Sequence, residues 1–234
     1  MKYQYENKFE LVNTVFNNVS DKYDLMNDIM SLGTHRIWKK NLISWMKPSP
    51  NHSIIDVASG TGDLAKLCSE STKNKSKITC VEPNKKMLAT GKAKLKNIKN
   101  IKWVLSTAEV LPFENNSFDL YVISFGIRNV TDINKSLKEA FRVLKTGGRF
   151  FCLEFSHVQN ELLKKIYDNY SKIIPSVGKF IVGNKMPYEY LIKSINEFYS
   201  QDDLARIISK NGFIDTEYRN LTNGIAAIHT GWKI

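Results

Sequence analysis

The sequence predicts an α/β fold with a doubly wound, mostly parallel sheet of seven strands that ends in an antiparallel hairpin. Two observations support this prediction. From Ile54 onward, short apolar segments alternate with segments of helical periodicity, the pattern of a parallel sheet covered by helices. Near the C-terminus, Thr222-Asn223-Gly224 lies between two apolar segments, and Asn-Gly in that position is a strong hairpin signal.

The expected strands are short and mostly continuously apolar. This composition indicates burial on both faces, as in the centre of a parallel sheet. We expect strands at Ile54–Val57, Ile78–Glu82, Ile101–Leu105, Asp119–Ser124, Arg149–Glu154, Phe213–Arg219 and Ile225–Thr230. The intervening periodicity predicts helices at Gly62–Glu70, Lys85–Leu95, Asp132–Leu144 and Asp202–Asn211.

Helical segments also lie outside this alternation. Phe9, Val12, Phe16 and Val19 recur at spacings of three and four, so residues 1–50 are expected to form an N-terminal helical cap. Residues 51–234 are expected to form the main domain, with a helical insertion at about 157–200 that is rich in aromatic and aliphatic side chains. A helical layer over the carboxyl ends of strands often forms the roof of an active site.

Composition narrows the function classes. The net charge of +11 comes largely from lysine, with only six arginines. Nucleic-acid recognition favours arginines grouped with exposed aromatic residues, so no nucleic-acid partner is expected. The excess of lysine instead predicts a weak attraction to an anionic membrane. Cys68, Cys80 and Cys152 are odd in number and form no C-x-x-C pattern, so neither a disulfide framework nor a metal site is expected. No apolar run approaches the length needed to span a bilayer.

A glycine-rich turn follows the first expected strand in the sequence VASGTGDLA, residues 57–65. Gly60 and Gly62 allow the backbone to approach a ligand closely, and the following helix points its amides toward the same space. Twenty residues past Gly62, Glu82 ends the second strand, where a carboxylate can accept both hydroxyls of a ribose. This pattern fits a nicotinamide cofactor and S-adenosylmethionine equally.

Two aspartates next to the turn distinguish these cofactors. Asp56 and Asp63 would repel the phosphates of a dinucleotide, by about 3 kcal/mol for unit charges ~5 Å apart at an effective dielectric constant near 20. S-adenosylmethionine carries a sulfonium and an ammonium but no phosphate. The acids therefore favour S-adenosylmethionine, with S-adenosylhomocysteine as the product. In the predicted sheet, Thr107 and Ala108 would lie near the adenine and Ser124 beneath the methionine portion.

Longer motifs resemble a known family, the ubiquinone and menaquinone biosynthesis C-methyltransferases or UbiE family. The resemblance extends from Val15 to Ile234, and YDLMND together with FGIRNV is highly specific. The motifs are VFNNVSDKYDLMNDIMSLGTHRIWK (Val15–Lys39), DVASGTGD (Asp56–Asp63), AEVLPFENNSFD (Ala108–Asp119), ISFGIRNVTD (Ile123–Asp132), RVLKTGGRFFCLEFS (Arg142–Ser156) and NLTNGIAAIHTGWK (Asn220–Lys233).

The resemblance implies a class I methyltransferase-like fold and methyl transfer from S-adenosylmethionine to a ring carbon of a polyprenyl benzoquinol. The alternative substrate is the naphthoquinol of the menaquinone branch. By similarity, the cofactor contacts fall on Thr61, Glu82, Thr107, Ala108 and Ser124. Glu82-Pro83-Asn84 departs from the Asp-Ile-Asn more usual in the family, and Ser59 stands where the family often has glycine.

Catalysis is expected to depend on positioning the ring carbon and stabilising a developing phenolate. Arg128, just beyond the fourth strand, is assigned to holding the phenolate or orienting a water, because its pKa excludes it as a base. Asn129 is assigned to hydrogen-bonding a ring oxygen of the quinol. His35 is a second candidate base because histidine titrates near neutral pH. The simpler alternative for Arg128 is a surface ion pair with Asp132.

Two rival functions share some of these features: a nicotinamide-dependent reductase and a non-catalytic subunit of a quinone-biosynthesis complex. The prenyl tail of the substrate implies peripheral contact with a membrane surface. A second copy of the chain, in a homodimer, is a further expected partner. The closing AIHTGWKI is closer to the mitochondrial branch, the 2-methoxy-6-polyprenyl-1,4-benzoquinol methylases. It implies the matrix side of the mitochondrial inner membrane, with the bacterial cytoplasm as the alternative.

Overall fold

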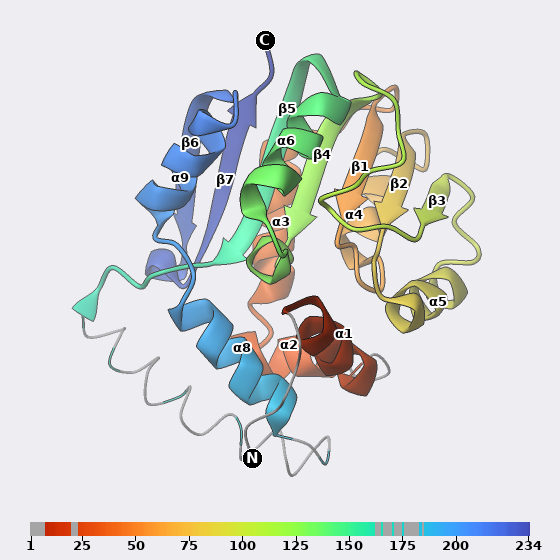
Figure 1. Ribbon diagram of the computed structural model, residues 1–234. Helices are drawn as coiled ribbons and strands as arrows, with labels where there is room; N and C mark the ends of the chain where they lie inside the picture. Colours follow the sequence, from red (N-terminus) through yellow and green to blue (C-terminus); the bar gives the residue numbers. More distant parts are fainter. Residues whose placement is uncertain are drawn as a thin grey trace.

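A single seven-stranded sheet forms the centre of the computed structural model, which describes residues 8–19, 23–161, 165, 170, 175, 183 and 185–234 (Figure 1). The strands follow the order β3-β2-β1-β4-β5-β7-β6. Their bounds are β1 (Ser53–Val57), β2 (Lys77–Val81), β3 (Ile101–Val104), β4 (Phe118–Ser124), β5 (Leu144–Phe155), β6 (Ile214–Leu221) and β7 (Ala226–Trp232).

The first five strands are parallel, and β7 pairs antiparallel with both β5 and β6. The hairpin predicted from Asn-Gly is confirmed: the short helix η3 (Thr222–Gly224) joins β6 to β7. Asn223 and Gly224 both have positive φ, 53° and 92°, conformations that asparagine and glycine adopt most readily. The fold class predicted from the sequence is therefore confirmed.

Polar caps begin several of the helices. Asn84, Asp132 and Ser200 each accept a hydrogen bond from the backbone N–H three residues on, which satisfies a free donor of the first turn. The helices are α1 (Lys8–Val19), α2 (Tyr23–Ser31), α3 (His35–Met46), α4 (Asp63–Ser71), α5 (Lys85–Lys94), η2 (Ile127–Asn129), α6 (Ile133–Val143), α8 (Met186–Asn196) and α9 (Gln201–Lys210).

The sheet is buried on both faces, as the continuous apolar runs predicted. Neighbouring residues of one strand enter different cores: Ile54 packs with α3 and α4, whereas Ile55 packs with α6 and α9. The strand predicted to begin at Arg149 begins earlier, because Leu144 already pairs with Phe118 across a register shift. Helix α6 consequently ends at Val143, and Gly147 lies within β5.

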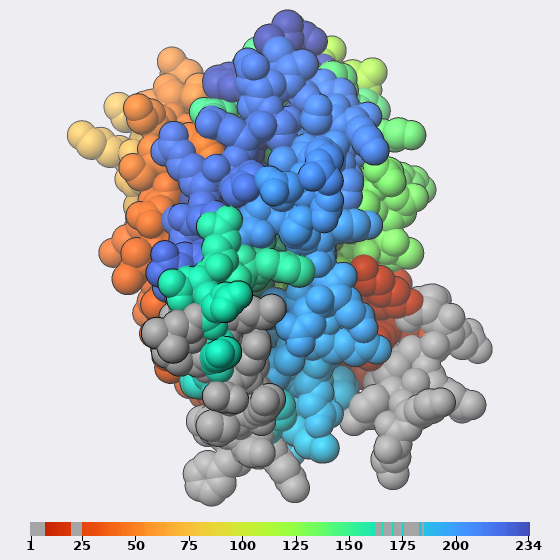
Figure 2. Space-filling model, turned by 90° about the vertical axis from the view of Figure 1, so that its left-hand side faces the viewer, coloured from red at the N-terminus to blue at the C-terminus, as the bar shows by residue number. Residues whose placement is uncertain are grey.

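Helices α1, α2 and α8 gather at the carboxyl ends of the parallel strands (Figure 1). Helix α1 contacts α8, α2, α5 and η2, and Figure 2 shows α8 beside α1 below the body formed by β6 and α9. Much of the insertion predicted at about 157–200 falls outside the described residues, and α8 is its described helix. None of the helices in the described ranges has the length and apolarity needed to span a bilayer.

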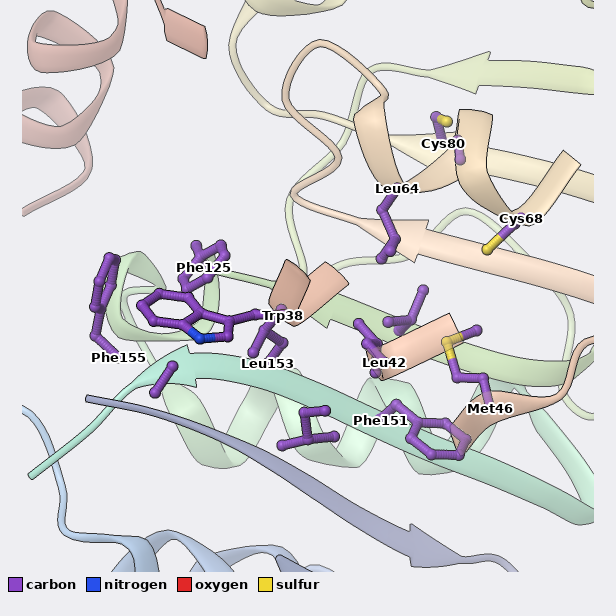
Figure 3. Packing of buried hydrophobic residues seen from close by; sticks show 14 of the residues in the cluster. Trp38, Leu42, Met46, Leu64, Cys68, Cys80, Phe125, Phe151, Leu153 and Phe155 are labelled. Atoms are coloured by element: carbon purple, nitrogen blue, oxygen red, sulfur yellow. The ribbon is translucent and has the colours of Figure 1, made fainter. Parts of the chain in front are cut away.

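Helix α3 is fixed to the sheet by an aromatic cluster. The ring of Trp38 lies 6.2 Å from that of Phe125 and 5.9 Å from that of Phe155, as centroid distances, and Leu42 and Met46 continue the same buried face (Figure 3). The indole N–H of Trp38 also donates to Oγ1 of Thr222 at 2.9 Å. These contacts hold α3 against the ends of β4 and β5.

Candidate active site

A polar crevice opens where the strand order reverses, between the carboxyl ends of β1 and β4. This switch point is where open α/β sheets bind their ligands. The loops after the two strands approach so closely that a Cβ on Gly126 would lie 2.6 Å from Cβ of Ala58. We call this site the central crevice; its lining residues are Lys39, Asp56, Ala58, Ser59, Thr61, Asp63, Leu64, Ser124 and Phe125.

The glycine turn requires glycine for two reasons. Gly60 and Gly62 have φ of 59° and 84°, values that strain residues with a Cβ. A Cβ on Gly62 would also lie 2.7 Å from a methyl carbon of Leu95 and 2.8 Å from the ring of Trp103. The turn is therefore shaped by φ and by close packing, and Gly62 leads directly into α4.

Glu82 is tied to this turn, although it comes from the end of β2. Its Oε2 accepts the N–H of Gly60 at 2.8 Å, and its Oε1 accepts the N–H of Asn84 at 2.9 Å. Burial raises the pKa of Glu82 to about 7, despite the opposing effect of these two hydrogen bonds. The carboxylate thus has both a fixed position and free lone pairs for further hydrogen bonds.

The two aspartates that distinguish the cofactors in sequence occupy different environments. Asp56 is fully buried, and burial raises its pKa to about 7. Although burial acts in the same direction on Asp63, Lys39 and Lys94 hold its pKa at about 2. Asp63 accepts hydrogen bonds from both lysines, at 3.3 and 2.7 Å. Its charge is therefore offset locally, so the repulsion expected from two free aspartates falls mainly on Asp56.

The remaining predicted cofactor residues lie on three loops at this edge of the sheet. Thr61 and Ser124 line the central crevice, and Oγ of Ser124 has no hydrogen-bond partner among the described residues. Thr107 and Ala108 follow β3 and do not line the crevice; Ala108 is buried in the core on the α6 side. The structure thus brings Thr61 and Ser124 together in the crevice and ties Glu82 to the same glycine turn through Gly60, whereas Thr107 and Ala108 lie outside the crevice.

Arg128 pairs with Glu154, and the predicted alternative, an ion pair with Asp132, is wrong. Nη1 of Arg128 donates to Oε1 of Glu154 at 2.6 Å and to the carbonyl of Phe125 at 2.8 Å. Both side chains are buried, with exposed fractions of 5% and 1%. Asp132 instead caps α6 through the N–H of Lys135. The guanidinium is therefore an interior charge held by the end of β5.

Asn129 is oriented from α8. Its Oδ1 accepts the hydroxyl hydrogen of Tyr190 at 2.9 Å. Next to it lies a second hollow of about 490 Å³, which we call the α1–α8 cleft. Its walls are Lys8, Leu11, Ile127, Arg128, Val130, Thr131, Ile133, Tyr190, Lys193, Ser194, Glu197, Phe198 and Tyr199. Arg128 thus lines this cleft and, through Phe125, contacts the wall of the central crevice.

His35 is positioned by α2. Its Nε2 lies 2.9 Å from Oδ1 of Asp28, which also binds Arg36. Burial lowers the pKa of His35, and the contact with Asp28 opposes that shift. His35 lines neither hollow, although Lys39, one helical turn further along α3, reaches the central crevice.

Sequence reasoning missed Lys39, Glu154 and Tyr190. Glu154 carried a usable signal, because an acid directly after the apolar residues Phe150–Leu153 of a strand expected to be buried requires a buried partner. Lys39 is one of two adjacent lysines in its helical segment, and Tyr190 one of many aromatic residues in the expected insertion. Neither pattern separates these two side chains from their neighbours.

Two solved structures with a similar fold are described as S-adenosylmethionine-dependent methyltransferases. An S-adenosylmethionine-dependent methyltransferase of Thermotoga maritima matches with a TM-score of 0.68 at 20% identity, covering 95% of this chain and 100% of that one. An S-adenosylmethionine-dependent methyltransferase of Aquifex aeolicus matches with a TM-score of 0.62 at 14% identity, covering 84% and 89%. With the strand order and the antiparallel β7, these matches define the fold as that of S-adenosylmethionine-dependent methyltransferases.

Sequence comparison narrows the class further. The profile of the ubiE/COQ5 methyltransferase family matches residues 2–233. The ubiquinone/menaquinone biosynthesis C-methyltransferase UbiE of Rickettsia prowazekii is 50% identical, covering 100% of this chain and 96% of that protein. The protein of the same name from Brucella abortus is 49% identical, covering 96% and 86%. The chain belongs to the ubiE/COQ5 methyltransferase family and is an S-adenosylmethionine-dependent C-methyltransferase.

Proposed function

We propose that this enzyme methylates the ring of a polyprenyl benzoquinol, as a 2-methoxy-6-polyprenyl-1,4-benzoquinol methylase of ubiquinone biosynthesis. The observation that carries the proposal is the buried Arg128, which lines the α1–α8 cleft and bonds to Phe125 of the central crevice. Methylation of a demethylmenaquinol is the second candidate function, because the names of the relatives include both quinones.

The cofactor is proposed to occupy the central crevice and the loops beside it. S-adenosylmethionine supplies a methyl group on a sulfonium when it is bound. Gly60, Thr61 and Gly62 give it a close backbone approach, and Glu82 accepts the ribose hydroxyls. Thr107 and Ala108 are assigned to the adenine, and Ser124 to the methionine portion. The buried, unpartnered Oγ of Ser124 and Oδ2 of Asp56, both among the described residues, fit a polar ligand with donor groups.

Arg128 and Asn129 are proposed to act on the quinol. A cationic guanidinium lowers the energy of a phenolate that forms on the ring, and Asn129 donates an amide hydrogen to a ring oxygen. The bond from Tyr190 to Oδ1 fixes the amide of Asn129, whose Nδ2 donates one hydrogen to the carbonyl of Phe125 at 3.4 Å and keeps the other for a ring oxygen. Because Glu154 compensates much of the charge, Arg128 stabilises a partial negative charge rather than a free phenolate.

His35 has a weaker claim to a catalytic role. Its bond to Asp28 and its burial support a structural role between α2 and α3. His35 and Asn129 both line neither hollow, but Asn129 directly follows Arg128 and bonds to Tyr190 of the cleft wall, whereas His35 bonds to Asp28 of α2. We therefore favour a water oriented by Arg128 as the proton acceptor, and retain His35 as the alternative base.

Helices α1 and α8 are proposed to form the substrate entrance. The α1–α8 cleft contains apolar groups beside polar ones, which suits a quinol ring and the first prenyl units. We keep the division into an N-terminal cap over residues 1–50 and a methyltransferase domain over residues 51–234 with an insertion at about 157–200. Lys8 links the two parts, since its ammonium donates to the carbonyls of Arg128 and Val130 at 2.9 and 2.7 Å.

The prenyl tail implies peripheral contact with a membrane surface, which the lysine-rich composition favours. A homodimer and a quinone-biosynthesis complex remain proposed partners. The relatives reported above are bacterial, and none supports the mitochondrial location expected from AIHTGWKI. We therefore propose the bacterial cytoplasm, at the inner surface of the membrane, as the site of action.

Two short-tailed substrates test the proposal directly. The purified enzyme is incubated with S-adenosylmethionine and either a demethyl benzoquinol or a demethylmenaquinol analogue, and the methylated products are measured by mass spectrometry. We expect a higher kcat/KM with the benzoquinol, and a preference for the naphthoquinol would move the enzyme to the menaquinone branch. Arg128→Ala should abolish turnover while S-adenosylhomocysteine still binds; normal turnover would remove Arg128 from the mechanism.

A further inference from the structure

Lys39 brings a buried cation from the N-terminal helices into the central crevice. Its side chain is only 8% exposed and lines the crevice together with Asp56, Thr61 and Ser124. Helix α3 carries it there, because the neighbouring Trp38 fixes the helix against Phe125 and the η3 turn. Lysine is rarely buried without a specific partner.

The partner seen for Lys39 does not account for its position by itself. Its ammonium lies 3.3 Å from Oδ2 of Asp63, whereas Lys94 already contacts the other oxygen, Oδ1, at 2.7 Å. An ammonium group has three donors, and the contact with Asp63 uses one of them. Lys39 and Lys94 therefore share the compensation of Asp63, and Lys39 retains donors on the crevice side.

The groups beside Lys39 complement an α-amino acid. Oδ2 of Asp56 is buried and has no hydrogen-bond partner within the described part of the chain, so it can accept from an ammonium. Lys39 supplies the opposite charge in the same crevice, and its charge acts on Asp56. An acid and a base side by side match the ammonium and the carboxylate that a free amino acid carries on one carbon.

We infer that Lys39 binds the α-carboxylate of the methionine portion of the cofactor, while Asp56 binds its α-ammonium. The inference rests on the proposed placement of the cofactor in the central crevice. It makes the N-terminal helices part of the cofactor site. A ligand without the amino-acid group would therefore receive no binding energy from Lys39 on α3. The glycine turn and Glu82 would still bind the adenosine of such a ligand.

Three ligands separate the parts of the site by isothermal titration calorimetry. S-adenosylhomocysteine has the whole amino-acid group, decarboxylated S-adenosylmethionine keeps the ammonium alone, and 5′-methylthioadenosine has neither. Lys39→Met should weaken S-adenosylhomocysteine about 10- to 100-fold, the range expected for loss of a charge-assisted hydrogen bond, whereas it should not weaken decarboxylated S-adenosylmethionine and should leave the affinity for 5′-methylthioadenosine unchanged. Lys39→Arg should restore most of the affinity because it keeps the charge.

Two further variants separate a failure of the Lys39 inference from a failure of the proposed cofactor placement. Lys94→Met, which removes the other lysine from Asp63, should change the affinities for S-adenosylhomocysteine and 5′-methylthioadenosine by the same factor. If Lys39→Met also changes both equally, or changes neither, Lys39 serves Asp63 alone and the inference is wrong. Glu82→Gln should weaken all three ligands, and full affinity in that variant would instead overturn the placement of the cofactor. Binding of 5′-methylthioadenosine by Lys39→Met also shows that this variant is folded.

Discussion

Replacing Glu154 with glutamine should destabilise the protein by about 3 to 5 kcal/mol, because Arg128 would remain as an uncompensated charge in the interior. The two side chains are 5% and 1% exposed, so water at the wall of the cleft can replace only a small part of the stabilisation that the carboxylate gives the guanidinium. Nη1 and Oε1 are 2.6 Å apart. For charge centres ~4 Å apart at an effective dielectric constant near 20, the lost attraction is also about 4 kcal/mol.

A double-variant cycle measures this effect. Urea unfolding followed by tryptophan fluorescence gives the free energy of unfolding of the wild type, Glu154→Gln, Arg128→Met and the double variant. The double variant should recover to within about 1 kcal/mol of wild type, because two neutral side chains need no mutual compensation. Its glutamine oxygen can still accept the N–H of Phe155, which Oε1 of Glu154 accepts at 2.9 Å in the native protein.

Two results would refute this reasoning. A loss below about 1 kcal/mol in Glu154→Gln would mean that the pair behaves like an exposed ion pair. Additive losses in the double variant would mean that each side chain stabilises the fold through contacts other than the pair. Whatever its stability, the double variant should be inactive in methyl transfer because it lacks Arg128. A folded but inactive double variant would show that Arg128 has a catalytic role besides its structural one.

Three further predictions follow from the site. Affinity for S-adenosylhomocysteine should fall by up to about tenfold from pH 8 to pH 6, because Asp56 with a pKa of about 7 loses its charge; calorimetry checks this, and a flat profile contradicts it. The unliganded protein should show the opposite trend in urea unfolding. Its stability should fall as pH rises from 4 to 7, since folding raises the pKa values of both Asp56 and Glu82 to about 7, and together these outweigh the opposite contribution of His229, whose pKa burial lowers to about 4; a gain over that range would contradict this. Gly91→Ala should cost about 1 to 3 kcal/mol, as its Cβ would lie 2.2 Å from the ring of Trp103; an unchanged thermal midpoint would be the contrary result.

The features that the sequence predicted depend on short spacings along the chain. Alternating apolar and helical segments gave the strands of a doubly buried sheet, and Asn223-Gly224 gave the hairpin between β6 and β7. The glycine turn with Glu82 one strand further on located the crevice, since the carboxyl ends of parallel strands meet at one edge of the sheet. Backbone conformation and periodicity are local properties, so they can be read from the sequence.

Partnerships between distant side chains required the tertiary structure. Arg128 pairs with Glu154 rather than with Asp132, because η2 lies against the end of β5 while Asp132 caps its own helix. Lys39 enters the crevice because Trp38 fixes α3; although it ends the motif Val15–Lys39, its sequence position does not show that it is buried or which groups it faces. The sequence by itself determined which backbone turns meet at the site. Packing decided which charges are buried there together, since burial and pairing depend on segments that are brought together only by folding.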